Sequence, residues 1–445
     1  MKSMFRRIYN CFKYPALGIV AVFSLILIWE LFFVKDIPRI DDSIMLKKPA
    51  AVDARLNAWP LAAEACVDYR YAKKVKWDTL SMAMYRYPER VALLKKAVLL
   101  PKSQGKPLKG PGDRIPIIMS LRWLTEALLK NAESESAANP AAAQEKIRLV
   151  FKTGGIIEAP DGYGIIIGNA IGCMLKYSAA EELNRLMQKG LLSRNDLAGW
   201  ADFLKTQKTS DIGYRYAMRN EYYSMTRVLE DIKKSDARQF EYITPYELSL
   251  TAYIALDNHV RRFVFKPERI RKEYYRRCLR DFNNAALPAS KMVTENTVYD
   301  VKPFSVRTFS RLLSGDFGTD VFMQHVYFDM HKLLIRRRYV DFVVEGLRVK
   351  AAALAYMADN GSSPKSLNDL VPEYLNSVPR DPFDGAALRY DSRKGIVYSV
   401  GTNLRDDGGV SESRIFEGYA KDIEGKTSWQ YKYYSAMKDL VISIK

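Results

Sequence analysis

Histidine and cysteine, the residues that most often bind metals or act in catalysis, are scarce in this sequence. Its 445 residues include three histidines, His259, His325 and His331, and four cysteines. His325 and His331 are six residues apart, which would place their imidazoles on different faces of a helix. A structural histidine is therefore the simpler interpretation of each position, with a metal ligand as the alternative.

Common catalytic motifs are also missing. The sequence has no HExxH zinc motif, no GxSxG nucleophile elbow and no Walker phosphate loop. No single reaction is indicated. If the protein is an enzyme, its site must be assembled from residues that lie far apart in the sequence.

The cysteines are too few for a disulfide scaffold. Cys11 precedes the main apolar segment, whereas Cys66, Cys173 and Cys278 follow it, without CxxC or metal-type spacing. Cys173 lies in an apolar run, which is typical of a small buried hydrophobic residue. One disulfide among the last three is compatible with the sequence, but nothing in it favours a particular pair.

The longest apolar run is residues 15–34, PALGIVAVFSLILIWELFFV. About 20 apolar residues are needed to cross the hydrocarbon core of a bilayer as a helix. Its one charged residue, Glu30, and the aromatic Trp29 lie near the downstream end, where they can reach the interface. We predict a transmembrane helix that contacts the lipid bilayer.

The flanking charges predict the orientation of this helix. Lys2, Arg6, Arg7 and Lys13 precede it without any acid, whereas acidic residues offset the cations that follow it. The positive-inside rule then places residues 1–14 in the cytoplasm and exports the rest. A cleaved signal peptide is the alternative, but the run is long and no small-x-small cleavage site follows it.

The net charge of +18 indicates a basic surface. Such a surface can simply be solvated, or it can attract anionic lipid headgroups and acidic partners. The most basic stretch, residues 259–280, interleaves cations with aromatic residues, a pattern that also occurs in nucleic-acid binding. The alternative is an amphipathic helix that begins after Pro267. Because the segment is predicted to be exported, we expect no nucleic-acid partner.

Residues 53–318 have mainly helical periodicity, after a proline-containing tether at residues 35–52. Helix-start signals occur at Asn139-Pro140, at Ser193 with Asp196, and at Thr244 with Glu247. Short polar joins between such helices predict an ectodomain that is a helical bundle or repeat-like array.

The C-terminal region changes character. Residues 340–359 form an amphipathic helical pattern that ends at Asn360-Gly361, a typical helix C-cap. Residues 388–390 and 396–400 then predict two antiparallel strands joined by a short turn.

An ordered series of short motifs runs through this region. It comprises Asn360-Gly361, Pro364-x-x-Leu367, Pro379-Arg380-Asp381-Pro382-Phe383 and Tyr398-Ser399-x-Gly401, followed by an acidic, glycine-rich loop. This series is similar to the C-terminal half of the major pseudopilin of type II secretion systems. The resemblance implies a small β-sheet packed on the long helix. The sequence contains no prepilin cleavage motif with Phe-Thr-Leu-x-Glu, so the resemblance supports a fold module more strongly than processing and assembly into a pilus.

The whole layout also resembles bacterial envelope proteins that join an N-terminal anchor and a helical ectodomain to such a tail. This likeness implies a single-pass protein of the bacterial inner membrane, with its N-terminus in the cytoplasm and its bulk in the periplasm. Its partners would be other envelope proteins.

The resemblance to pseudopilins implies a calcium site in the loop after Tyr398. Thr402, Asn403, Asp406 and Asp407 offer side-chain oxygens within six residues. Calcium takes six to eight oxygen ligands, so backbone carbonyls and water would have to complete a weak site. The alternative is a turn that uses Asp and Gly for their backbone preferences and binds no metal.

We therefore expect a mainly α protein with a small C-terminal α+β module. The expected parts are a cytoplasmic tail (1–14), a transmembrane helix (15–34), a tether (35–52), a helical ectodomain (53–318) and a long helix with a pseudopilin-like tail (319–445). The expected function is that of a non-enzymatic envelope scaffold or secretion-associated partner. The alternative is a hydrolase-like envelope enzyme with its site in a groove of the ectodomain.

Overall fold

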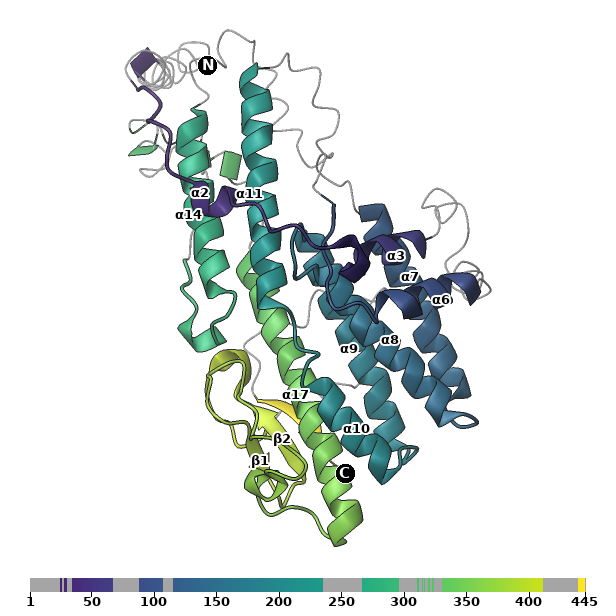
Figure 1. Ribbon diagram of the computed structural model, residues 1–445. Coiled ribbons are helices and arrows are strands. Elements are labelled where there is room, and N and C mark those ends of the chain that lie inside the picture. The colour runs from purple at the N-terminus through teal and green to yellow at the C-terminus, as the bar shows by residue number, and fades with distance from the viewer. Residues whose placement is uncertain are drawn as a thin grey trace, which may run out of the picture. The chain divides into compact units, whose positions relative to one another are not determined.

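The computed structural model describes residues 34–66, 88–106, 115–234, 266–295, 330–410 and 439–444, together with scattered positions between 25 and 29 and between 310 and 323 (Figure 1). This part of the chain is mainly helical and contains a three-stranded antiparallel sheet, which confirms the expected fold class in outline. It divides into two compact units, and each is described by itself.

The larger unit comprises Lys47–Glu221, Arg280–Thr294 and Met330–Lys445. Its helical part begins with η1 (Ala54–Leu56), α3 (Trp59–Glu64) and α6 (Pro88–Ala97), which pack beside three longer helices. These are α7 (Ile115–Glu135), α8 (Pro140–Glu158) and α9 (Ile166–Gln188). Helix α8 lies between α7 and α9 and packs against both, and leucine, isoleucine and phenylalanine side chains fill the core between them.

Two predicted helix starts are confirmed. Asn139 accepts a hydrogen bond from the backbone N–H of Ala142, with Pro140 at the first helical position of α8. Ser193 and Asp196 form a reciprocal capping box at the start of α10 (Arg194–Leu204). Each contact satisfies backbone donors that the first turn of a helix leaves free. The predicted start at Thr244 lies outside the described residues.

Helix α17 (Met330–Asn360) is the centre of this unit. It extends ten residues upstream of the predicted 340–359, and it ends as predicted before Gly361, whose φ of +70° suits glycine. Nearly all of residues 337–353 are buried, because α9 and α10 cover one side of the helix and the sheet covers another. Figure 1 shows α17 running between α10 and the strands.

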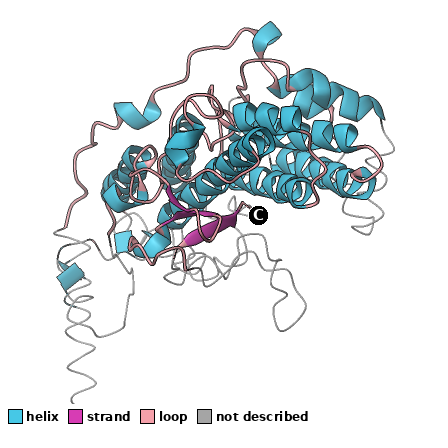
Figure 2. Cartoon of the chain, turned by 90° about the horizontal axis from the view of Figure 1, so that it is seen from below, coloured by secondary structure: helices cyan, strands magenta, loops and turns pink. Residues whose placement is uncertain are grey.

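The sheet consists of β1 (Arg389–Asp391), β2 (Ile396–Ser399) and β3 (Leu440–Ser443), in the order β1-β2-β3. Val397 pairs with Tyr390 on one side and with Ile442 on the other. The hairpin of β1 and β2 is as predicted, whereas the sequence pattern does not predict β3. A Cβ atom at Gly346 of α17 would lie 2.6 Å from Cδ1 of Ile442, so β3 lies directly on the helix. Figure 2 shows the strands beside the helices, near the C-terminal end of the chain. The tail also contains η5 (Leu367–Leu370) and η6 (Gly401–Asn403), and η4 (Ala289–Lys291) contacts it through Pro382 and Phe383.

The smaller unit comprises Met1–Leu46, Tyr222–Leu279 and Glu295–Asp329. It contains α2 (Ser43–Leu46) and parts of α11 (Asp211–Lys234) and α14 (Pro267–Asn284). Tyr222 donates a hydrogen bond to Asp42 at 2.7 Å, and Arg271 forms ion pairs with Asp42 and Glu230. The described part of the basic stretch 259–280 is thus the helix that begins at Pro267, and acidic side chains pair with its buried arginines.

Most of the predicted anchor, residues 15–34, lies outside the described residues. None of the helices in the described part of the chain is long and apolar enough to cross a membrane. None of Cys66, Cys173 and Cys278 forms a disulfide within the described residues, and Cys173 is buried as the sequence predicts. His331 lies in α17, whereas His259 and His325 are outside the described residues.

Candidate functional site

The predicted calcium loop follows β2. Asn403 donates a hydrogen bond to Oδ2 of Asp407 at 2.9 Å, so these two side chains lie together. Asp406 instead accepts hydrogen bonds from the backbone of Gly408 and from Nε of Arg389, and Thr402 lies beside Asn403 in η6. Within the described ranges, no group of three or more His, Cys, Asp or Glu residues is arranged to bind a metal ion. Calcium binding at this loop stays a prediction.

A carboxylate distant in the sequence joins this loop to the sheet. Asp439, directly before β3, accepts hydrogen bonds from the backbone N–H groups of Asp407 (3.2 Å) and Gly409 (2.7 Å). Burial raises the pKa of Asp439. The loop is therefore closed by an aspartate that follows it by about thirty residues in the chain, which sequence spacing did not suggest.

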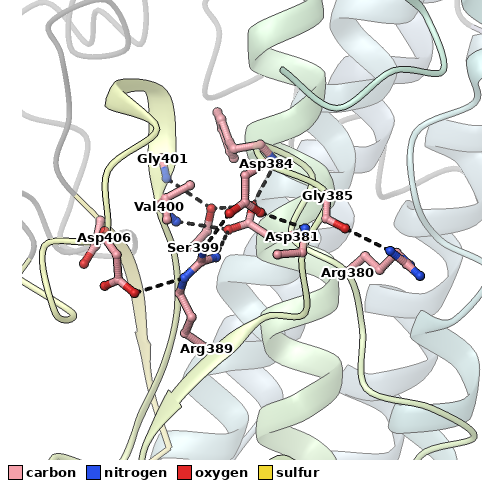
Figure 3. Close-up of polar contacts among 12 residues, drawn as sticks. Arg380, Asp381, Asp384, Gly385, Arg389, Ser399, Val400, Gly401 and Asp406 are labelled. Carbon is pink, nitrogen blue, oxygen red and sulfur yellow. Dashed lines mark hydrogen bonds and ion pairs between the residues drawn. The ribbon is translucent and has the colours of Figure 1, made fainter. Parts of the chain in front are cut away.

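The motif residues of the tail meet around Asp381, which is 1% exposed (Figure 3). Its carboxylate accepts hydrogen bonds from the backbone of Phe383 and Val400, from Oγ of Ser399 at 2.7 Å, and from Arg389 at 3.0 Å. Burial raises the pKa of Asp381, and the hydrogen bonds oppose that effect.

Arg389 extends this network. Its guanidinium also forms ion pairs with Asp384 at 2.5 Å and with Asp406 at 3.3 Å. The Asp-Pro-Phe and Tyr-Ser-x-Gly motifs therefore hold the turns of the tail together. We interpret this cluster as structural, because its acceptors are satisfied and its central carboxylate is enclosed.

A cavity of about 160 Å³ lies between α10, α17 and the loop after η5. Four alanines line its middle: Ala198, Ala201, Ala352 and Ala355. The small side chains leave the space open, and polar groups surround it at both ends. This cavity is the candidate functional site.

A polar cluster lies at one end of the cavity. Arg194, at the start of α10, forms a bidentate ion pair with Asp359 near the end of α17, with N–O distances of 2.7 to 3.1 Å. The hydroxyl of Tyr374 donates to the same carboxylate at 2.8 Å. The hydrogen bonds from Arg194 and Tyr374 lower the pKa of Asp359. This cluster joins α10, α17 and the tail.

The opposite end is basic. Arg348 of α17 is 7% exposed, and its guanidinium donates one hydrogen bond to Glu345 at 3.1 Å. Its Nε is buried and has no acceptor within the described structure. Glu345 is shared with Lys208, at 2.9 Å, and Lys205 lines the cavity one turn before Lys208. One carboxylate therefore pairs with two cations here, and a third cation, Lys205, lines the same cavity.

Two acidic side chains line the remainder of the cavity. Asp202 projects from α10, and Glu373 precedes Tyr374 in the tail. Neither has an ion-pair partner among the residues that the structure describes. The cavity is thus dipolar, with excess positive charge at the Arg348 end and excess negative charge beyond it.

Other charges are buried in the bundle and do not line this cavity. Lys176 bonds to Glu158 at 2.9 Å, and Arg338 bonds to Asp341 at 2.8 Å. Lys350 is 1% exposed and donates to Oδ1 of Asn184 at 3.0 Å. Burial lowers the pKa of Lys350 to about 8. These groups support the packing of α17 against its neighbours.

Sequence reasoning missed the residues of the cavity, because they come from three distant segments. One signal was present: Arg348, Ala352 and Ala355 are spaced so that a charged and two small residues share one helix face. No protein-family model, curated protein or solved structure matches this chain. The chemistry of the site is therefore the basis for its interpretation.

Proposed function

We propose that the protein is a non-enzymatic scaffold of the bacterial envelope, anchored in the inner membrane by residues 15–34. In this proposal its N-terminus is cytoplasmic, its bulk lies in the periplasm, and its tail binds envelope proteins associated with secretion. The pseudopilin-like motifs of the tail support the last point by resemblance.

The observation that carries the proposal is that one helix, α17, packs against both the helical bundle and the sheet of the tail. The same stretch of this helix packs against α9 and α10 on one side and against β2 and β3 on another. The Arg194–Asp359–Tyr374 cluster joins α10, α17 and the loop before the sheet. A module held in this way keeps a defined orientation on its support, and a preorganised surface binds a partner at a smaller entropic cost.

Site-specific crosslinking tests the proposal. A photoreactive residue would be placed at Arg393, in the exposed turn of the β1–β2 hairpin, and, as a matched control, at Lys189, an exposed residue at the end of α9. We expect the Arg393 position to crosslink reproducibly to one or a few envelope proteins in native membranes, and the Lys189 position to give far less. Equal, diffuse labelling at both positions would argue against a scaffold that acts through its tail.

The alternative function is that of a hydrolase-like envelope enzyme. The cavity beside α10 is the observation in its favour, because enzyme sites are concave and contain a few convergent polar groups. Screening the purified protein against ester, peptide and phosphoester substrates separates the two proposals. Turnover that disappears in Asp202→Asn or Glu373→Gln would support the enzyme.

A further inference from the structure

We propose that the cavity between α10, α17 and the tail binds a small zwitterion that carries a carboxylate and an amine at opposite ends. This inference does not depend on the scaffold proposal. It rests on the charge distribution, the unsatisfied guanidinium and the size of the cavity.

The two helices run in opposite directions along the cavity, which fixes the order of its groups. Arg194 at the start of α10 pairs with Asp359 near the end of α17, and Lys208 just after α10 pairs with Glu345. Between these pairs, Lys205 therefore lies at the level of Arg348, and Asp202 lies about one turn nearer to Asp359. Positive and negative groups are separated along the axis of the cavity.

Arg348 is the proposed carboxylate partner. Its side chain is more than nine-tenths buried and lines the cavity, yet only one of its nitrogens is bonded, to a carboxylate that also serves Lys208. The enclosed Nε cannot meet a ligand, but Nη2 makes no hydrogen bond in the described structure and is not enclosed, so it is the donor that an acceptor in the cavity would meet. The planar guanidinium suits the two oxygens of a carboxylate, and Lys205 adds a second cation beside it.

Asp202 and Glu373 are the proposed amine partners. Within the described part of the chain both lack ion pairs, and both line the same cavity as Arg348. Both acids are exposed and solvated, so they do not require a partner, but they would repel a ligand that carried a carboxylate alone. An amine at its far end removes that repulsion, because opposite charges then face each other at both ends.

The volume limits the ligand to a small molecule. A cavity of about 160 Å³ is close to the 150 Å³ that holds one benzene in an engineered protein cavity, so the ligand has roughly six to nine non-hydrogen atoms. Asp202 precedes Lys205 by three residues, a rise of about 4.5 Å along the helix, which matches a carboxylate and an amine separated by a few methylenes rather than by one.

Isothermal titration calorimetry on the full-length protein in detergent tests the inference with matched probes. They are 4-aminobutyrate, glycine, and the single-charge analogues butyrate and butylamine, each up to about 10 mM. We expect 4-aminobutyrate to bind at least tenfold more tightly than the other three. Equal binding of butyrate would show an anion site only, equal binding of butylamine a cation site only, and no binding by any probe an unused cavity. Each of these results would overturn the inference.

Variants locate the binding. Arg348→Met should weaken the binding of 4-aminobutyrate at least tenfold, and Lys205→Met at least threefold. Lys189→Met, outside the cavity, should leave the affinity unchanged. Arg348 is buried, so Arg348→Met can fail to fold. Lys205 is exposed, so Lys205→Met is expected to fold and then serves as the test variant. Circular dichroism checks the helical content of each variant. Unchanged affinity in folded Lys205→Met and Asp202→Asn proteins would place the binding elsewhere and refute the assignment.

Discussion

Replacing Lys350 with methionine should change how the stability of the protein depends on pH. Lys350 is 1% exposed, and one hydrogen bond to Asn184 is its polar contact in the described structure. Burial away from water disfavours the ammonium form and lowers the pKa of Lys350 from its ordinary value near 10.5 to about 8. Methionine has a similar length and carries no charge.

The direction of this pH dependence follows from the number of protons that the folded and the unfolded protein bind. Between pH 8 and pH 10.5 the folded protein has lost the proton of Lys350, whereas the unfolded chain still holds it. The unfolded state then binds more protons, so the free energy of unfolding rises with pH in this window. A pKa difference of this size corresponds to about 3 kcal/mol. Between pH 8 and pH 10.5 the free energy of unfolding of the wild type should therefore rise by about 3 kcal/mol relative to that of Lys350→Met. Below pH 8 the difference between the two proteins should not change with pH.

Urea unfolding followed by circular dichroism measures this difference at pH 7, 8, 9, 10 and 10.5. Tyrosine and thiol groups also titrate in alkali, but they are common to both proteins and cancel in the comparison. Lys365→Met, which removes an exposed lysine, is the matched control and should show no such trend. A wild-type minus Lys350→Met difference that stays within about 0.5 kcal/mol from pH 8 to 10.5 would refute the burial argument.

Three further predictions concern other parts of the chain. If residues 15–34 are an uncleaved anchor, the protein in membranes should begin near Met1 and resist extraction by alkali; a mature N-terminus beyond residue 34 would contradict this. Asp381→Asn should lower the free energy of unfolding by about 3 kcal/mol, because an amide nitrogen in place of one buried carboxylate oxygen would face the N–H and O–H donors of Phe383, Ser399 and Val400 and leave some of them unsatisfied, whereas Asp391→Asn at the hairpin turn should cost about 1 kcal/mol or less; equal melting temperatures of the two variants would be the contrary result. If the loop after β2 binds calcium with a dissociation constant near 10 µM, one millimolar calcium should stabilise the protein by about 2.7 kcal/mol over chelator, and Asp406→Ala with Asp407→Ala should abolish this; coincident melting curves would leave the loop as a turn.

The features that sequence predicted correctly depend on neighbouring residues. The capping box of Ser193 and Asp196 spans three residues, and the glycine that ends α17 is required by the backbone angle at that one position. The hairpin of β1 and β2 is likewise a local structure with a short turn. In such cases the interacting groups lie within one window of the sequence, so their pattern predicts the structure directly.

The features that sequence missed depend on distant partners. Asp439 closes a loop about thirty residues before it, and β3 pairs with β2 across more than forty residues. The upstream part of α17 was missed because Arg337 and Arg338 interrupt the apolar stripe. They are nevertheless buried, since Asp211 and Asp341 compensate their charges. A pattern of polarity cannot reveal partners that only the tertiary fold brings together.

The position of α17 between its neighbours constrains how the length of this chain can change. Lys350 faces α9, Arg348 and Ala352 face α10, and Gly346 faces β3, all within two turns of the helix. Each residue of an α-helix adds about 100° of rotation and 1.5 Å of rise. Inserting or deleting one residue inside this stretch would turn every later side chain toward the wrong neighbour. We therefore expect insertions and deletions to be tolerated in the loops between helices and to prevent correct folding when they fall within α17.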